Sequence, residues 1–192
     1  MALARLGKIF EEENDFDNAI GIYNQILSVQ LTYESYVKIG DCYKKQGNLI
    51  QASQSYKEGL SIQQTSEIYQ KMAEVSKMQH QYKKAYELYQ SSLMLLSDDN
   101  SKLEERRHCF VESGKMCLLT DEYENAINSF KDALDIEETE CELALLGDSF
   151  YGKGEYTDAL EQYEKVMKMA SEDVDEEDWE LLEKIALCFD RK

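Results

Sequence analysis

The sequence predicts an all-α protein built from repeated pairs of helices, and three observations support this fold class. The 192 residues include no proline and only 9 glycines, a composition that favours helix throughout. An alanine recurs at intervals of 33, 33, 41 and 33 residues, with an aromatic residue or leucine three positions before it and an aromatic residue four positions after it. Twelve positions before each alanine stands another small residue. The triplets are Phe16-Ala19-Tyr23, Leu49-Ala52-Tyr56, Tyr82-Ala85-Tyr89, Tyr123-Ala126-Phe130 and Tyr156-Ala159-Tyr163.

The small residues upstream of the alanines predict where helices touch. A glycine in the middle of a helix destabilises it, so we expect one there only where another helix passes too close for a larger side chain. The alanines support the same argument for the second helix of each pair. The upstream column consists of Gly7, Gly40, Ala73, Gly114 and Gly147.

The stretches 39–52 and 146–159 show the repeated pattern most fully. Each has an apolar residue before a glycine, an aromatic residue three positions after that glycine, a second glycine in the turn and then the alanine. In this the chain resembles the tetratricopeptide repeat family, whose unit is a helix-turn-helix of about 34 residues. The resemblance covers nearly the whole chain. It implies an α-solenoid of five repeats plus a partial sixth, wound into a right-handed superhelix. The proline that usually closes each unit of the family is missing throughout.

The repeat spacing divides the chain into three segments. Residues 1–97 hold units one to three, and residues 98–170 hold units four and five after an acidic insertion. Residues 171–192 form an acidic connector and then either a capping helix or the first helix of a sixth unit. Residues 185–189 repeat the pattern of residues 39–43, and no separate N-terminal cap is visible. We therefore favour a segment of a longer array over a capped, complete solenoid.

Several short motifs predict where helices begin and end. Thr32 is a candidate N-cap, and the pairs Ser101/Glu104 and Thr139/Glu142 have the spacing of capping boxes. We expect residues 98–100 (Asp-Asp-Asn) to break the chain between helices, and the helix that follows to begin near Ser101.

Charge is distributed unevenly along the chain. Residues 1–97 contain 11 acidic and 10 basic residues, whereas residues 98–192 contain 28 and 11. The formal net charge of −18 disfavours nucleic acid as a partner, because phosphate binding requires a basic surface. The surplus acid of residues 98–192 favours a basic partner surface, although acidic connectors that only keep the array soluble are an equal alternative.

No pattern in the sequence points to catalysis, a metal or a cofactor. The two histidines, His80 and His108, are 28 residues apart, and none of the 5 cysteines lies in a CxxC pair, so we expect solvated histidines and buried, reduced thiols. No phosphate-binding loop occurs, and the longest apolar run is four residues, too short for a membrane span. We also predict no signal peptide.

The resemblance to tetratricopeptide repeats implies that the first helices line a concave groove. The candidate groove residues are the first-helix positions that are not needed for packing. Ala4, Glu11 and Ala144 belong to these positions together with the main candidates. The main candidates are Lys8, Val37, Asp41, Lys44, Gln70, Glu74, Lys77, Val111, Lys115, Leu118, Asp148 and Tyr151. Their mixture of charged and apolar side chains fits a helical or extended protein segment that has both kinds of side chain.

The leading functional hypothesis is a non-catalytic scaffold within a larger multiprotein assembly. We expect a cytoplasmic protein, and cytoskeletal and ciliary assemblies are places where such arrays work in the family. The first alternative is a peptide-binding adaptor or co-chaperone. The family's clamp for acidic tails needs Lys and Asn, then Asn, then Lys and Arg, whereas this chain offers Ala4 and Lys8, Lys38, then Glu67 and Lys71. The second alternative is a regulatory arm of an enzyme whose catalytic domain lies outside these residues.

Overall fold

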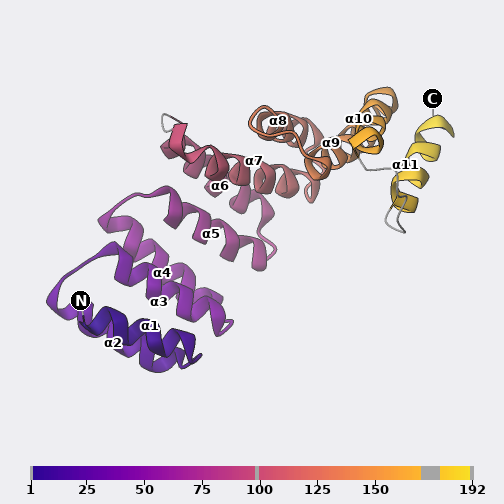
Figure 1. The fold of residues 1–192 in the computed structure, drawn as a ribbon. Coiled ribbons are helices and arrows are strands. Elements are labelled where there is room, and N and C mark those ends of the chain that lie inside the picture. The colour runs from indigo at the N-terminus through magenta and orange to yellow at the C-terminus, as the bar shows by residue number, and fades with distance from the viewer. Residues whose placement is uncertain (1, 98–99, 170–177, 191–192) are drawn as a thin grey trace. The chain divides into compact units, whose positions relative to one another are not determined.

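The computed structural model describes residues 2–97, 100–169 and 178–190, with the side chains of 178–181 left out, and every regular element in these ranges is a helix (Figure 1). The all-α prediction is confirmed. The elements are α1 (Ala2–Glu12), α2 (Phe16–Val29), α3 (Tyr33–Lys45), α4 (Leu49–Ile62), α5 (Ser66–Met78), α6 (Tyr82–Leu96), the 3₁₀ helix η1 (Asn100–Lys102), α7 (Leu103–Leu118), α8 (Tyr123–Leu134), α9 (Glu140–Lys153), α10 (Tyr156–Met169) and α11 (Asp178–Asp190).

The helices belong to two compact units, Met1–Leu95 and Leu96–Lys192. Successive helices pack on one another from α1 to α5 in the first unit and from α7 to α11 in the second. This serial packing of helix pairs confirms the predicted solenoid architecture. Most of the acidic connector lies outside the described residues, as do Asp98 and Asp99 of the predicted helix break.

Side-chain caps form at some of the predicted helix starts but not at others. The Thr139 hydroxyl accepts a hydrogen bond from the backbone N–H of Glu142 at 3.4 Å, so this cap is confirmed. Thr32 is the N-cap residue of α3, but its hydroxyl bonds to Ser35 Oγ at 2.9 Å and caps no backbone N–H. The helix predicted to begin near Ser101 does begin there, because η1 spans Asn100–Lys102 and α7 follows directly at Leu103, although no side chain caps α7.

Every turn between paired helices contains one residue with positive φ. The five residues are Asn14, Gly47, His80, Asp121 and Gly154, with φ of 60°, 78°, 58°, 57° and 87°. Glycine adopts this left-handed conformation without a steric cost, whereas the other three residues adopt it at a cost. The repeat therefore fixes the turn geometry even where the sequence supplies no glycine.

The upstream glycines lie against the aromatic rings of the second helices. A Cβ atom on Gly7 would lie 2.8 Å from the Tyr23 ring, and one on Gly114 would lie 2.7 Å from the Phe130 ring, both shorter than real Cβ contacts. Gly40 and Gly147 meet Tyr56 and Tyr163 in the same way. The alanines at the predicted close-packing positions are all fully buried: Ala19, Ala52, Ala85, Ala126 and Ala159.

Candidate protein-binding groove

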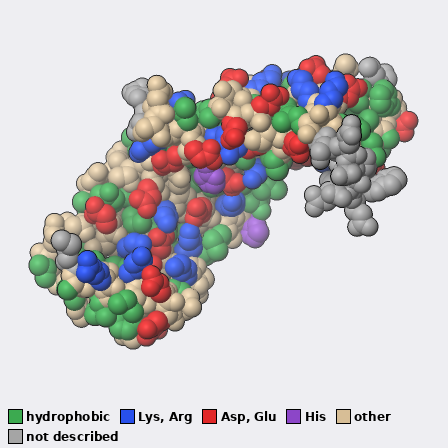
Figure 2. Space-filling model, in the orientation of Figure 1, with side chains coloured by type: hydrophobic (Ala, Val, Ile, Leu, Met, Phe, Trp, Pro, Cys, Tyr) green, Lys and Arg blue, Asp and Glu red, His purple; other side chains and the backbone are tan. Residues whose placement is uncertain are grey.

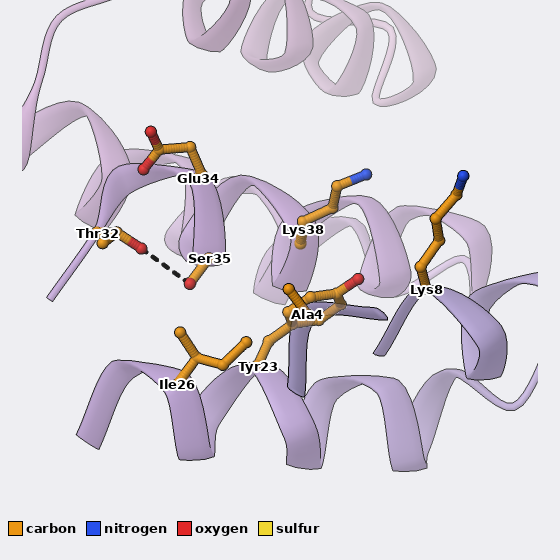
Figure 3. A pocket seen from close by; sticks show the side chains of 8 residues that line it. All are labelled: Ala4, Lys8, Tyr23, Ile26, Thr32, Glu34, Ser35 and Lys38. Carbon is orange, nitrogen blue, oxygen red and sulfur yellow. Dashed lines mark hydrogen bonds between the residues drawn. The ribbon is translucent and has the colours of Figure 1, made fainter. Parts of the chain in front are cut away.

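A cavity of about 400 Å³ lies between α1 and α3, the first helices of the first two repeats (Figure 3). Ala4 of α1 and Tyr23 and Ile26 of α2 contribute its apolar lining. The cavity can form here because Ala4 is small, whereas the equivalent position of α3 is Val37. Thr32 and Ser35, joined by their hydroxyl hydrogen bond, lie beside Ile26 in Figure 3.

Charged side chains form the open edge of this cavity. In Figure 3, Lys8 of α1 and Glu34 and Lys38 of α3 extend from the cavity toward the side opposite α2. Lys8 Nζ lies 3.6 Å from Glu12 Oε1, with both side chains more than 60% exposed, so this ion pair contributes little. Lys38 Nζ lies 3.9 Å from Glu11 and its side chain is 48% exposed. Both ammonium groups can therefore reach a carboxylate on a bound segment.

Asp41, a predicted groove residue, is occupied within the fold. Its side chain accepts a hydrogen bond from the Tyr56 hydroxyl at 2.7 Å and another from Lys71 Nζ at 3.0 Å. Tyr56 is fully buried and its hydroxyl needs an acceptor, which Asp41 supplies. Burial and the nearby carboxylate raise the pKa of Tyr56 well above its ordinary value. Lys71 belongs to α5, so the carboxylate joins the core tyrosine of one repeat to the first helix of the next.

Asp148 makes the same contacts in the C-terminal unit. It accepts a hydrogen bond from the Tyr163 hydroxyl at 2.8 Å and one from Lys184 of α11 at 3.1 Å. In the first repeat Glu11 has this role, one helical turn beyond the position on α1 that corresponds to Asp41. Its carboxylate accepts a hydrogen bond from the Tyr23 hydroxyl. These tyrosine–carboxylate–lysine groups were missed from the sequence. Asp41 and Asp148 occupy the same position of the repeat, one residue after the glycine, and this match was the sequence feature that could have indicated a shared role.

The other predicted groove residues of the N-terminal unit differ in accessibility. Val37 is 4% exposed and belongs to the hydrophobic core with Tyr56, so it offers no apolar anchor. Lys44 pairs with Glu74 at 2.5 Å. The Gln70 side chain donates to Ser92 Oγ at 3.1 Å. Lys77, in the last turn of α5, is partly exposed.

The predicted groove residues of the C-terminal unit also differ in accessibility. Val111 is 9% exposed and faces the interior. Lys115 pairs with Glu112 at 2.9 Å and keeps 43% of its side chain exposed. Leu118 is partly exposed, and Tyr151 makes an edge-on contact with Tyr156, with ring centroids 5.4 Å apart.

Arg107 organises a charged cluster that the sequence did not predict. Its guanidinium lies 2.9 Å from Glu104, 3.2 Å from Glu137 and 2.6 Å from Glu142. Glu142 is 6% exposed. Its carboxylate accepts a hydrogen bond from Arg107 and does not complete the predicted capping box. Glu104 likewise bonds Arg107. The cluster joins α7, the loop after α8 and the start of α9.

The histidine and cysteine side chains of the described residues show no arrangement suited to metal binding. Among them no group of three or more His, Cys, Asp and Glu side chains could hold a metal ion, and no helix is long and apolar enough to cross a membrane. Both histidines are exposed as predicted. Four cysteines are buried as predicted, but Cys141 is exposed. Burial raises the pKa of Cys42 to about 11 and that of Cys117 to about 12, so both thiols stay protonated near neutral pH.

Surface charge in the N-terminal unit is intermingled. Figure 2 shows Lys and Arg side chains alternating with Asp and Glu over this unit, with apolar side chains between them. Charged and apolar side chains are therefore interspersed on the visible face of this unit.

Comparison with known proteins gives a consistent result. Residues 2–32 and residues 33–66 each match a family model described as tetratricopeptide repeat. No curated protein matches the sequence.

Several solved structures share the fold at low sequence identity. MamA is 21% identical, with 84% of this chain and 92% of that chain covered and a TM-score of 0.72. YrrB, described as a TPR protein with an unusual peptide-binding site, is 14% identical over 90% of this chain and 87% of that chain, with a TM-score of 0.73. A tetratricopeptide repeat protein from Parabacteroides merdae ATCC 43184 is 17% identical over 99% and 72% of the two chains, with a TM-score of 0.76.

Proposed function

Because the chain is a tetratricopeptide-repeat protein, we propose that it is a non-catalytic scaffold that binds other proteins as part of a multiprotein assembly. Helix-pair solenoids present extended surfaces along their first helices, and such surfaces suit the binding of protein segments.

The observation that carries the proposal is the cavity between α1 and α3. Its apolar lining from Ala4 and Ile26 can take a small apolar side chain, and Lys8 and Lys38 at its edge can pair with a neighbouring carboxylate. The occupant is therefore a protein segment with an apolar residue beside an acidic one. YrrB supports this proposal because its description names a peptide-binding site.

The C-terminal unit is proposed to favour a basic partner surface. Residues 98–192 contain 28 acidic against 11 basic residues, which attracts cationic surfaces at low salt. Asp148 is engaged with Tyr163 and Lys184, so we assign this role to more exposed acids such as Glu138 and Glu140.

A peptide-display selection against the full chain tests the groove proposal. We expect the selected peptides to pair an apolar with an acidic residue, and to bind the double variant Lys8→Glu, Lys38→Glu at least tenfold more weakly, because the charge at the cavity edge is reversed. Lys57→Glu, on the exposed side of α4, is the matched control and should leave binding unchanged. Equal binding to the double variant would remove the groove from the proposal.

The second candidate is a peptide-binding adaptor of the co-chaperone type. Lys8, Lys38 and Lys71 lie on successive first helices and favour an acidic segment, but Lys71 already pairs with Asp41 at 2.9 Å. Titration with acidic C-terminal tail peptides of heat-shock chaperones separates the two functions. Saturable, tight binding would favour the adaptor, and its absence would leave the scaffold.

A further inference from the structure

A second cavity lies between α8 and α10, the second helices of two successive repeats in the C-terminal unit. It measures about 520 Å³, and side chains of α9 form its floor. These are Leu143, Leu146 and Phe150, which are 2%, 3% and 8% exposed, and Leu134 of α8 adds to the apolar surface. The helices on both sides of α9 are in place, so the cavity belongs to the junction of two repeats and not to an uncovered helix face.

The same junction is open in the N-terminal unit, where a cavity of about 270 Å³ lies between α2 and α4. Tyr36, Ile39 and Tyr43 of α3 line it, at the repeat positions of the three α9 residues. The helices on either side contribute uncharged polar side chains and one carboxylate. These are Asn24, Gln51, Gln54, Ser55 and Glu58. The repeat therefore supplies the opening, and the surrounding side chains decide what it can bind.

The cavity of the C-terminal unit differs from this one because three exposed carboxylates line it. Asp135 is the C-cap residue of α8, Glu138 lies in the loop before α9, and Asp158 lies in the first turn of α10. In the described part of the chain none of these three side chains forms a hydrogen bond or an ion pair. Carboxylates without a cation of their own attract a basic ligand at low salt.

The two lysines that also line the cavity already have partners. Lys131 Nζ lies 5.4 Å from the centroid of the Phe150 ring, which is a cation–π contact. Lys165 Nζ lies 3.0 Å from Glu161 Oε1 and donates a hydrogen bond to the Gln162 side chain at 3.3 Å. Together with Glu161 there are four carboxylates and two ammonium groups, so the net charge around the cavity is −2.

Gln162 supplies a hydrogen-bond donor at the cavity. Its side chain lines the cavity, and the residue is 8% exposed. The side-chain oxygen accepts the bond from Lys165, but the amide nitrogen donates to no acceptor within the described ranges. This nearly buried amide therefore keeps its donors for a ligand that brings a carbonyl oxygen. The equivalent residue of the N-terminal unit, Ser55, already bonds the backbone carbonyl of Gln51 at 2.9 Å.

We propose that the cavity between α8 and α10 binds an extended basic segment of a partner protein. This inference rests on the proposed function and assigns its basic partner to one place in the C-terminal unit. An apolar side chain of the segment enters the cavity, and the Gln162 amide donates to a backbone carbonyl of the segment. Lys or Arg residues on either side of the apolar residue pair with the carboxylates.

The positions of the carboxylates set the spacing of the basic residues. Leu143 and Phe150 are seven residues apart on α9, which is about 10 Å along the helix. Glu138 precedes the start of α9 and Asp158 follows its end, so these carboxylates lie toward opposite ends of that distance. Every second side chain of an extended segment points the same way, and a step of four residues covers about 13 Å. The segment therefore has basic residues four positions apart, with the apolar residue midway.

A biased peptide library tests the proposal with the full chain. The probe is a displayed library of peptides of about twelve residues, with Lys or Arg fixed at two positions four apart and the other positions random. We expect the peptides selected at low salt to have Leu, Ile or Phe midway between the basic residues. In anisotropy titrations with fluorescein-labelled copies, the double variant Glu138→Lys, Asp158→Lys should bind them at least tenfold more weakly.

Three further variants make the result specific. Glu164→Lys, Glu183→Lys changes the net charge by the same amount at exposed residues that do not line the cavity, and should bind normally. Gln162→Met keeps the length of the side chain but removes its amide, so it should weaken binding about fivefold, as for one hydrogen bond. Lys8→Glu, Lys38→Glu alters the cavity between α1 and α3 and should also bind normally. Circular dichroism should show that every variant keeps its helices.

Several outcomes would overturn the proposal. One is the absence of saturable binding, and another is equal binding by the Glu138, Asp158 variant and the unchanged chain. Equal losses in both charge-reversed double variants would mean that net charge alone attracts the peptides. If binding depended on Lys8 and Lys38 instead, this inference would fail while the scaffold function stood. In sedimentation velocity, a dimer that dissociates on changing Glu138 and Asp158 would identify a second copy as the occupant of the cavity.

Discussion

The two compact units share a tyrosine–carboxylate–lysine arrangement and differ in surface charge. Both join a core tyrosine to a carboxylate of the same repeat and to a lysine of the next first helix, through Asp41 in one unit and Asp148 in the other. The N-terminal unit has 11 acidic and 10 basic residues, whereas residues 98–192 have 28 and 11. The contacts that build the repeat are therefore insensitive to the charge around them, and surface charge is free to differ with the binding partner.

The units also differ in how completely the carboxylate of this arrangement is buried. The Asp41 side chain is 12% exposed and that of Asp148 is 30% exposed. The N-terminal unit has a second such tyrosine, Tyr23, whereas Phe130 occupies this position in one repeat of the C-terminal unit. Phenylalanine needs no acceptor, and the residue after Gly114 is accordingly a lysine. We expect the N-terminal unit to depend more strongly on these tyrosines.

Alkaline pH should separate the units most clearly. Burial and a nearby carboxylate raise the pKa of Tyr23, Tyr56 and Tyr163 above 10.0 in the folded chain. The stability that these three tyrosines contribute is therefore fully present well below pH 10 and is lost progressively above it, because only the unfolded chain releases their protons. At pH 11 each tyrosine costs about 1.4 kcal/mol, or about 3 kcal/mol for the pair Tyr23 and Tyr56.

Urea unfolding at pH 8 and pH 11, followed by circular dichroism, measures this loss. The variant Tyr23→Phe, Tyr56→Phe should lose about twice as much of the alkaline effect as Tyr163→Phe, in line with about 1.4 kcal/mol for each titrating group. An alkaline loss that neither variant reduces would show that other groups cause it.

Substitution of the packed glycines should have the next largest effect. Gly40→Ala and Gly147→Ala each place a methyl group into a tyrosine ring, and we expect a cost of about 2 kcal/mol in either unit. Gly21→Ala is the control in the middle of α2, because its added Cβ meets no atom within 4 Å. This variant should gain about 0.5 kcal/mol from helix propensity. Thermal unfolding would contradict the packing argument if all three variants shifted in one direction.

Removal of the shared carboxylates should distinguish the two buried networks. Asp41→Ala leaves the buried Tyr56 hydroxyl and Lys71 without this acceptor, at an expected cost of about 2 kcal/mol. Asp148→Ala should cost about 1 kcal/mol, because water reaches this more exposed site. Adding Tyr56→Phe to Asp41→Ala should recover part of the loss in urea unfolding. A fully additive double variant would mean that the hydrogen bond contributes nothing.

The turns should give the smallest effects. His80→Gly and Asp121→Gly relieve positive φ in one turn of each unit, and we expect about 0.5 kcal/mol of stabilisation. The gain is limited because His80 bonds Tyr82 at 2.7 Å and Asp121 bonds Tyr123 at 2.7 Å. Gly47→Ala, with open space around its Cβ, should lose about 1 kcal/mol from backbone strain alone. Thermal unfolding can compare all three variants, and a stabilised Gly47→Ala would refute the strain argument.

The sequence predicted the repeat because its evidence is local. A fixed spacing of glycine, alanine and aromatic residues specifies which helices pair and where they approach. The contacts of Asp41, Val37 and Arg107 could not be predicted in this way. They depend on the rotation of each helix about its axis, and a small rotation decides whether a first-helix residue faces the groove or the neighbouring repeat. The cavity beside Ala4 follows from one small side chain, visible only once α1 and α3 are placed together.

The shared carboxylate has a consequence for how the array unfolds. In a one-dimensional array, stability divides into terms intrinsic to each repeat and coupling terms between neighbours. The bond from Tyr56 to Asp41 belongs to the first kind, and the bond from Lys71 to Asp41 belongs to the second. Since both end on one carboxylate, loss of α5 weakens the environment of a core tyrosine in the repeat before it. Local fraying of one repeat is thereby transmitted to its neighbour, which makes unfolding within the unit more cooperative than helix packing alone would.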